Sequence, residues 1–111
     1  MAAKRFYFSS SITDFVSRGN SEIIGDMTLA SQHDINDETS QSWVEEIETL
    51  REALSPYKGR GSVYFEYNIP RMGRRVDVIV VIDAIIFVLE YKTADRTFSR
   101  EALVQVWDYA L

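Results

Sequence analysis

The sequence contains no cysteine, one histidine and two prolines among its 111 residues. Without cysteine the chain has no disulfide framework, no thiolate metal site and no cysteine nucleophile, which fits a reducing, cytoplasmic setting. The single histidine, His33, lies in a polar stretch and is expected at the surface. The longest apolar runs are interrupted by Asp83 and Glu90. We therefore expect neither a signal peptide nor a membrane span.

Length and charge set further bounds. A chain of 111 residues can form one domain with a single core of ordinary size. The net charge is −5, but residues 1–57 hold ten acids and four bases, whereas residues 58–111 hold seven acids and eight bases. Residues 58–111 are therefore the part of the chain whose charge is more compatible with a bound phosphate group, although a run of charged residues often marks only a solvated face.

The first 39 residues are expected to form an N-terminal extension of short helices and a loop, followed by a core domain over residues 40–111. Two groups of apolar residues, around Phe15 and around Met27, predict short helical faces, and residues 31–42 are polar and predict a loop. A helix is then predicted from Ser42, which forms a capping-box pattern with Glu45, to Leu54.

The predicted helix carries one acid in an unusual place. Glu45 and its neighbours one turn apart fall on the wet face, but Glu46 lies three residues after Trp43 and four before Leu50, beside the apolar stripe. A carboxylate there is costly unless it is paired or bound. It could equally be a boundary residue whose head reaches water or an arginine.

Three strands are predicted after this helix. Residues 62–70 alternate between apolar and polar and predict a half-buried strand, whereas residues 74–83 are apolar on both faces apart from Asp77 and predict a central strand. Asp83 and Ala84 predict a tight reversal into a third strand that ends at Lys92. The last segment, from about residue 97, predicts a helix with Gln105 and Tyr109 on one side. No helix stop signal follows, so we expect the natural chain to continue.

The predicted central and third strands carry charged residues that could form a metal site. Asp77 and Glu90 are each six residues from the reversal, so they are expected to be cross-strand neighbours about 4.5 to 5.5 Å apart at Cβ. Two carboxylates at this spacing can hold Mg²⁺ or Mn²⁺, and Lys92 could orient a water and offset charge on a phosphate. The alternative is an ion pair that only closes the end of the sheet.

Asp77, the Glu90-Tyr91-Lys92 triplet, the preceding helix with Glu46 and the following Gln105 and Tyr109 together resemble the PD-(D/E)xK nuclease superfamily, in its QxxxY, RecB-like branch. The chain over roughly residues 40–111 also resembles the N-terminal region of uncharacterised bacterial proteins in which such a domain precedes a helicase-like P-loop ATPase. The resemblance implies an α/β (α+β) restriction-endonuclease-like core, with a helix, a three-stranded antiparallel meander and a helix, truncated before a further strand. Val76 stands where the superfamily name has proline.

The resemblance also implies roles for individual residues. Asp77, Glu90, Glu46 and the main-chain carbonyl of Tyr91 would bind the metal, and Lys92 would be catalytic. Nucleic-acid contacts would come from Gln105, Tyr109, Arg74 and Arg75, with DNA favoured over RNA. The leading hypothesis is a Mg²⁺-dependent nuclease domain of a larger helicase-like or ATPase-like protein. The alternatives are a catalytically inactive module of the same fold that binds nucleic acid or a partner, and a homodimerisation domain.

Overall fold

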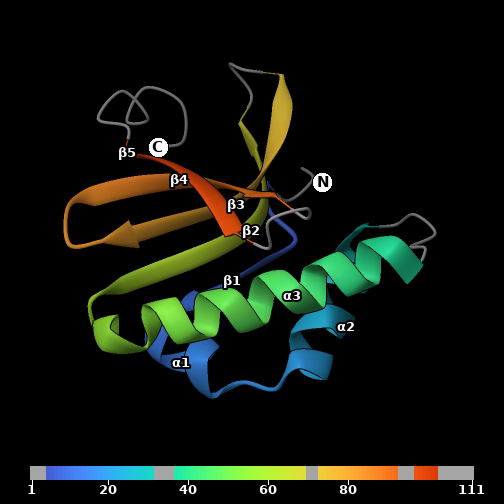
Figure 1. The fold of residues 1–111 in the computed structure, drawn as a ribbon, viewed down its shortest axis with the longest axis horizontal. Coiled ribbons are helices and arrows are strands. Elements are labelled where there is room, and N and C mark those ends of the chain that lie inside the picture. The colour runs from blue at the N-terminus through green and yellow to red at the C-terminus, as the bar shows by residue number, and fades with distance from the viewer. Residues whose placement is uncertain (1–4, 32–36, 70–72, 93–96, 103–111) are drawn as a thin grey trace.

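The computed structural model describes residues 5–31, 37–69, 73–92 and 97–102 (Figure 1). Helices and strands are segregated along the chain, which makes this an α+β arrangement. In chain order the elements are β1 (Phe8–Ser11), α1 (Ile12–Ser17), α2 (Asn20–Ser31), α3 (Asp37–Leu54), the 3-10 turn η1 (Ser55–Tyr57), β2 (Gly61–Ile69), β3 (Arg74–Ile82), β4 (Ile85–Lys92) and β5 (Thr97–Ala102).

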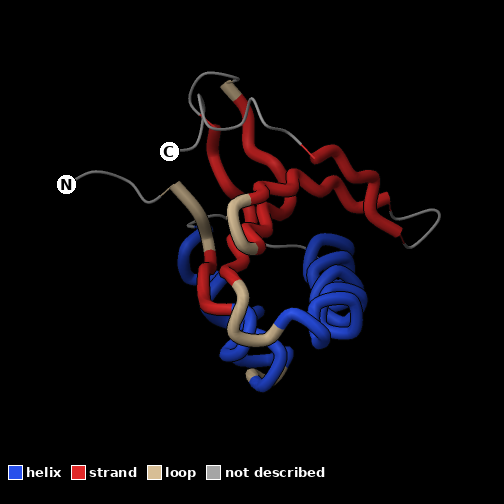
Figure 2. The backbone as a smooth tube through the Cα atoms, turned by 90° about the vertical axis from the view of Figure 1, so that its left-hand side faces the viewer, coloured by secondary structure: helices blue, strands red, loops and turns tan. Residues whose placement is uncertain are grey.

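The five strands form one sheet in the order β1-β2-β3-β4-β5, and every neighbouring pair is antiparallel. The three α-helices lie together on one face of this sheet (Figures 1 and 2). None of the helices in the described ranges is both long enough and apolar enough to span a membrane. The mixed fold expected from the sequence is therefore confirmed at the level of class.

The predicted pattern of β2, β3 and β4 is confirmed. In β2 the alternating residues Val63, Phe65, Tyr67 and Ile69 are all buried. In β3 burial is not restricted to one face, because Val78, Ile79 and Val80 are all almost inaccessible. The reversal falls at Asp83 and Ala84, between β3 and β4, and Asp83 has the left-handed φ of 55° that tight hairpin turns favour.

The sheet bends sharply at two opposed residues, Glu66 in β2 and Asp77 in β3. Phe65 pairs with Val78 and Tyr67 pairs with Val76, so Glu66 lies opposite Asp77 in the register. Glu66 has a φ of 54°, a left-handed conformation that is rare inside a strand. Beyond these two residues the β2–β3 hairpin turns away from the rest of the sheet, as the yellow ribbon in Figure 1 shows.

The bend also exchanges the faces of both strands. Phe65 and Val78 belong to the core cluster beneath the helices, but Tyr67 and Val76 belong to a second cluster. Residues two apart share a face in a regular strand, so the alternation must be broken between them. The fold therefore has two apolar clusters, and both strands pass from the first cluster to the second at the bend.

Helix α3 begins at Asp37, so the predicted start at Ser42 is wrong. Ser42 lies inside the helix, where its hydroxyl donates to Glu46 Oε2 at 3.2 Å instead of capping the helix. Asp37 and Glu38 favour the earlier start because acids in a first turn complement the helix dipole. The apolar stripe is as predicted, and its residues are buried: Trp43, Ile47, Leu50 and Leu54.

The prediction of a helix from about residue 97 is wrong for residues 97–102, which form β5. This strand pairs with β4 from Lys92 opposite Thr97 to Phe87 opposite Ala102. Thr97 and Phe98 favour strands, and β4 would otherwise expose an unpaired edge. The sheet consequently exceeds the expected three-stranded meander by β5 and β1. Gln105 and Tyr109 lie outside the described residues.

The first 39 residues contribute directly to the helix-side core. Phe8, Ile12, Phe15, Ile23 and Met27 are buried in the same cluster as the apolar stripe of α3. Ser11 caps α1 by accepting from the Asp14 amide at 3.1 Å.

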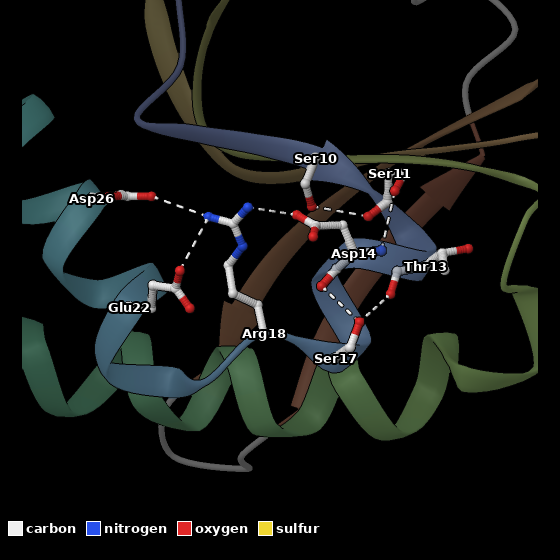
Figure 3. A network of polar contacts seen from close by, with 8 residues as sticks. All are labelled: Ser10, Ser11, Thr13, Asp14, Ser17, Arg18, Glu22 and Asp26. Carbon is white, nitrogen blue, oxygen red and sulfur yellow. Dashed lines mark hydrogen bonds and ion pairs between the residues drawn. The ribbon is translucent and has the colours of Figure 1, made fainter.

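Arg18 fixes the junction between α1 and α2 (Figure 3). Its guanidinium contacts Asp14 at 2.8 Å, Asp26 at 3.6 Å and Glu22 at 3.9 Å. Its main-chain carbonyl accepts from Arg51 Nη2 of α3 at 2.7 Å. This residue thereby ties the first two helices to the third.

Candidate functional site

Four acids from four elements influence one another electrostatically around the bend of the sheet. They are Glu46 of α3, Glu66 of β2, Asp77 of β3 and Glu90 of β4, and we call them the carboxylate cluster. The β3–β4 ladder pairs Val78 with Leu89, and the same register places Asp77 opposite Glu90. Neighbouring strands thus carry Glu66, Asp77 and Glu90 in one cross-strand row.

Glu46 is the most deeply buried of the four, with 3% of its surface exposed. The Ser42 hydroxyl donates to Oε2, while Oε1 is buried and has no hydrogen-bond partner among the described residues. Burial and, to a smaller extent, the charges of Asp77 and Glu66 together raise the pKa of Glu46 from 4.5 to about 8. Glu46 is therefore mostly protonated at neutral pH in this structure.

Glu66 is a member of the cluster that sequence reasoning missed. Burial and the charge of Asp77 together raise the pKa of Glu66 to about 7, although the positive charge of Arg75 acts in the opposite direction. Strand alternation assigned Glu66 to the polar face of β2, which gives no sign of burial. The left-handed φ of 54° brings it into the cluster, and no sequence pattern at this position predicts that conformation.

Asp77 lies where the β3–β4 ladder opens. The last paired residues on this side are Val78 and Leu89, and beyond them the Tyr91 amide donates to Asp77 Oδ2 at 2.7 Å. A side chain has thus replaced a main-chain acceptor, and the bond fixes the orientation of the carboxylate.

Tyr91 faces α3, because its hydroxyl donates to Glu45 Oε1 at 3.0 Å. The expectation that Glu45 points only to solvent is therefore wrong. Regular strand alternation would turn Glu90 to the opposite side of β4 from Tyr91, and this expectation stays a prediction. The charge of Glu90 still raises the pKa of both Glu46 and Glu66.

The positively charged candidates are only partly described. Lys92 ends β4, where its backbone pairs with Thr97, but its side chain and that of Arg74 lie outside the described part of the structure. Arg75 is exposed, lies over the Tyr7 ring at 4.6 Å and donates to the Tyr7 hydroxyl at 3.0 Å. Its guanidinium is therefore held beside the cluster.

The cluster offers the hard carboxylate oxygens that Mg²⁺ and Mn²⁺ prefer. The excess of acid and the unbonded Oε1 of Glu46 also fit a cation. However, no three acidic or histidine side chains in the described ranges are grouped closely enough to hold an ion.

Fold and site define an α+β domain with an acid-rich bend in an antiparallel sheet. Comparison of the chain with family models, with curated proteins and with solved structures finds no match.

Proposed function

We propose that this chain is a metal-dependent nuclease-like domain that hydrolyses phosphodiester bonds of nucleic acid, with DNA favoured over RNA, within a larger helicase-like or ATPase-like protein. The observation that carries the proposal is the convergence of acids at the opening between β3 and β4, where Glu46 reaches a pKa of about 8. Perturbed acids from several elements are typical of sites that bind or transform a ligand. The order of α3, β2, β3 and β4 also supports the resemblance to the PD-(D/E)xK nucleases.

Asp77, Glu90, Glu46 and the Tyr91 carbonyl would hold Mg²⁺ or Mn²⁺, and Glu66 would add negative charge. The ion, when bound, supplies an activated water and neutralises charge on the phosphate. The Tyr91 amide keeps the Asp77 carboxylate oriented. Glu46 would release its proton when the ion binds, because a cation favours the carboxylate form. Lys92 would contact the scissile phosphate.

A second candidate is a catalytically inactive module of the same fold. One observation favours it: no three acidic side chains of the described residues are grouped closely enough to hold an ion. Such a module would bind nucleic acid or a partner without cutting it.

Calorimetry and a cleavage assay separate the two candidates. The active domain binds Mg²⁺ or Mn²⁺ with release of protons, and Asp77→Asn abolishes both binding and cleavage. Lys92→Ala retains ion binding and loses cleavage. Glu52→Gln is the matched control, because Glu52 is an exposed acid on the same helix as Glu46. Absence of ion binding at millimolar concentration, in a protein that is folded by circular dichroism, would refute the nuclease proposal.

A further inference from the structure

A pocket of about 300 Å³ lies over the second apolar cluster. Its walls are Phe6, Tyr64 and Tyr67, its apolar residues include Ile79 and Ile86, and Arg5 also lines it. The residues that line it, all within the described ranges, include no acid. This composition contrasts with the neighbouring carboxylate cluster.

The bend of β2 creates this pocket. Tyr64 and Tyr67 are three residues apart, so a regular strand would place them on opposite faces. The left-handed Glu66 between them breaks the alternation, and both tyrosines then pack against Phe6, with ring centroids 5.6 and 6.3 Å away. Tyr64 and Tyr67 also meet edge to face at 5.7 Å. One distortion therefore produces both the acid cluster and an aromatic pocket beside it.

We propose that this pocket binds an unpaired base of a single nucleic-acid strand, with Arg5 against the adjacent phosphate. Its volume lies at the lower end of the range for ligand pockets, which suits one planar ring system. Phe6 and Tyr67 are nearly parallel, at 21°, but their centroids are too close to admit a base between them. Because Tyr67 is only 7% exposed, the base stacks on the outer face of Phe6, with the half-buried Tyr64 as a side wall.

The chemistry of the pocket matches that of single-strand binding sites. Such sites combine aromatic rings, on which any base can stack, with basic residues that follow the backbone. Arg5 is exposed and supplies that charge, and Tyr67 directly follows Glu66 in the chain. A base held here would bring its strand next to the carboxylate cluster. The inference thus deepens the proposed function, on which it rests, by selecting a single-stranded substrate.

Fluorescence anisotropy in EDTA tests the proposal without metal or cleavage. The full chain binds labelled oligothymidylate more tightly than a duplex of equal length. Phe6→Leu and Tyr64→Leu, the two pocket variants, each weaken single-strand binding about fivefold to a hundredfold, the loss expected when one stacking partner is removed. Arg5→Ala lowers the slope of log affinity against log salt by about one.

Tyr57→Leu is the matched control. Tyr57 is a partly exposed tyrosine of η1, outside the pocket, and its removal leaves strand affinity unchanged. Thermal unfolding of each variant establishes that it is folded. Crosslinking of a 4-thiothymidine oligonucleotide to wild-type protein gives a second readout, which requires no variant, and labels Phe6, Tyr64 or Tyr67.

Three results would overturn the inference: equal affinity of the folded pocket variants and wild type, crosslinks only elsewhere, or displacement of the oligonucleotide by equimolar free mononucleotide. The last would identify a site for small nucleotides. Failure of the pocket assignment is distinguishable from failure of the nuclease proposal. If Asp77→Asn abolishes cleavage while the pocket variants bind normally, only the pocket assignment fails. If the pocket variants lose binding while wild type never cleaves, only the nuclease assignment fails.

Discussion

Replacing Glu46 with glutamine is expected to stabilise the protein at neutral pH. The pKa of Glu46 is raised from 4.5 to about 8 in the folded chain, so folding opposes its ionisation. Stability associated with Glu46 is fully present below pH 4.5 and is lost as the pH rises towards 8. Since pH 7 lies 2.5 units above the ordinary pKa of 4.5 and each unit corresponds to about 1.4 kcal/mol, the free energy of unfolding is lowered at pH 7 by about 3 kcal/mol.

Urea unfolding at two pH values measures this effect. Glutamine keeps the shape of glutamate and cannot ionise, so Glu46→Gln recovers most of the loss at pH 7. With m values of about 1–3 kcal/mol per M, the midpoint rises by about 1–3 M. At pH 5 the gain falls below about 1 kcal/mol, because glutamate is then partly protonated in the unfolded chain as well.

The control is Glu52→Gln, which changes an exposed acid on the same helix and leaves the midpoint unchanged at both pH values. Saturating Mg²⁺ should narrow the difference between wild type and Glu46→Gln if the cluster binds an ion, because only the ionised acid gains from the cation. A gain that is equal at pH 5 and pH 7, or a destabilised Glu46→Gln, would refute the assignment of a buried, protonated Glu46.

Three other substitutions test the site and the core. Asp77→Ala should lower the free energy of unfolding by about 1–3 kcal/mol, because the Tyr91 amide loses its acceptor. Asp77→Asn should lower it less, because its side-chain oxygen can still accept. Equal losses of the two variants in urea unfolding would contradict the hydrogen bond between Tyr91 and Asp77. Glu66→Gly should be at least as stable as wild type by thermal unfolding, because glycine accepts a φ of 54° without strain, and a clear loss would argue against the left-handed conformation. Phe15→Ala should lower the free energy of unfolding by about 3–5 kcal/mol, because Phe15 is fully buried. Leu29→Ala should leave it almost unchanged, because Leu29 is 81% exposed. Similar losses for the two variants would mean that the first helices do not share the core.

Local patterns predicted the fold best where one period dominates. The alternation of β2, the apolar character of both faces of β3 and the stripe of α3 are local patterns that follow burial directly, so residues such as Phe65, Val78 and Ile47 could be placed in advance. Residues 97–102 have a mixed pattern, and pairing with β4 decided their conformation. Tertiary hydrogen bonding therefore overrode the local helical pattern.

The candidate site was predictable only in part. The length of the turn indicates that Asp77 lies opposite Glu90, and helical spacing indicates that Glu46 lies beside the core. Glu66 could not be found, because its burial depends on a left-handed residue inside a strand. The aromatic pocket has the same origin, since alternation alone would separate Tyr64 from Tyr67.

The raised pKa values in the carboxylate cluster affect which protonation states the folded protein can adopt. At pH 7, pKa values of about 8 for Glu46 and about 7 for Glu66 together correspond to a loss of at most about 6 kcal/mol. A domain of this size has a total stability of about 5–15 kcal/mol. The raised pKa values of Glu46 and Glu66 alone would therefore use up a large share of that stability. Protons held on these two acids or a cation bound beside them would each reduce the loss, and the number of protons released when Mg²⁺ is added distinguishes these two states.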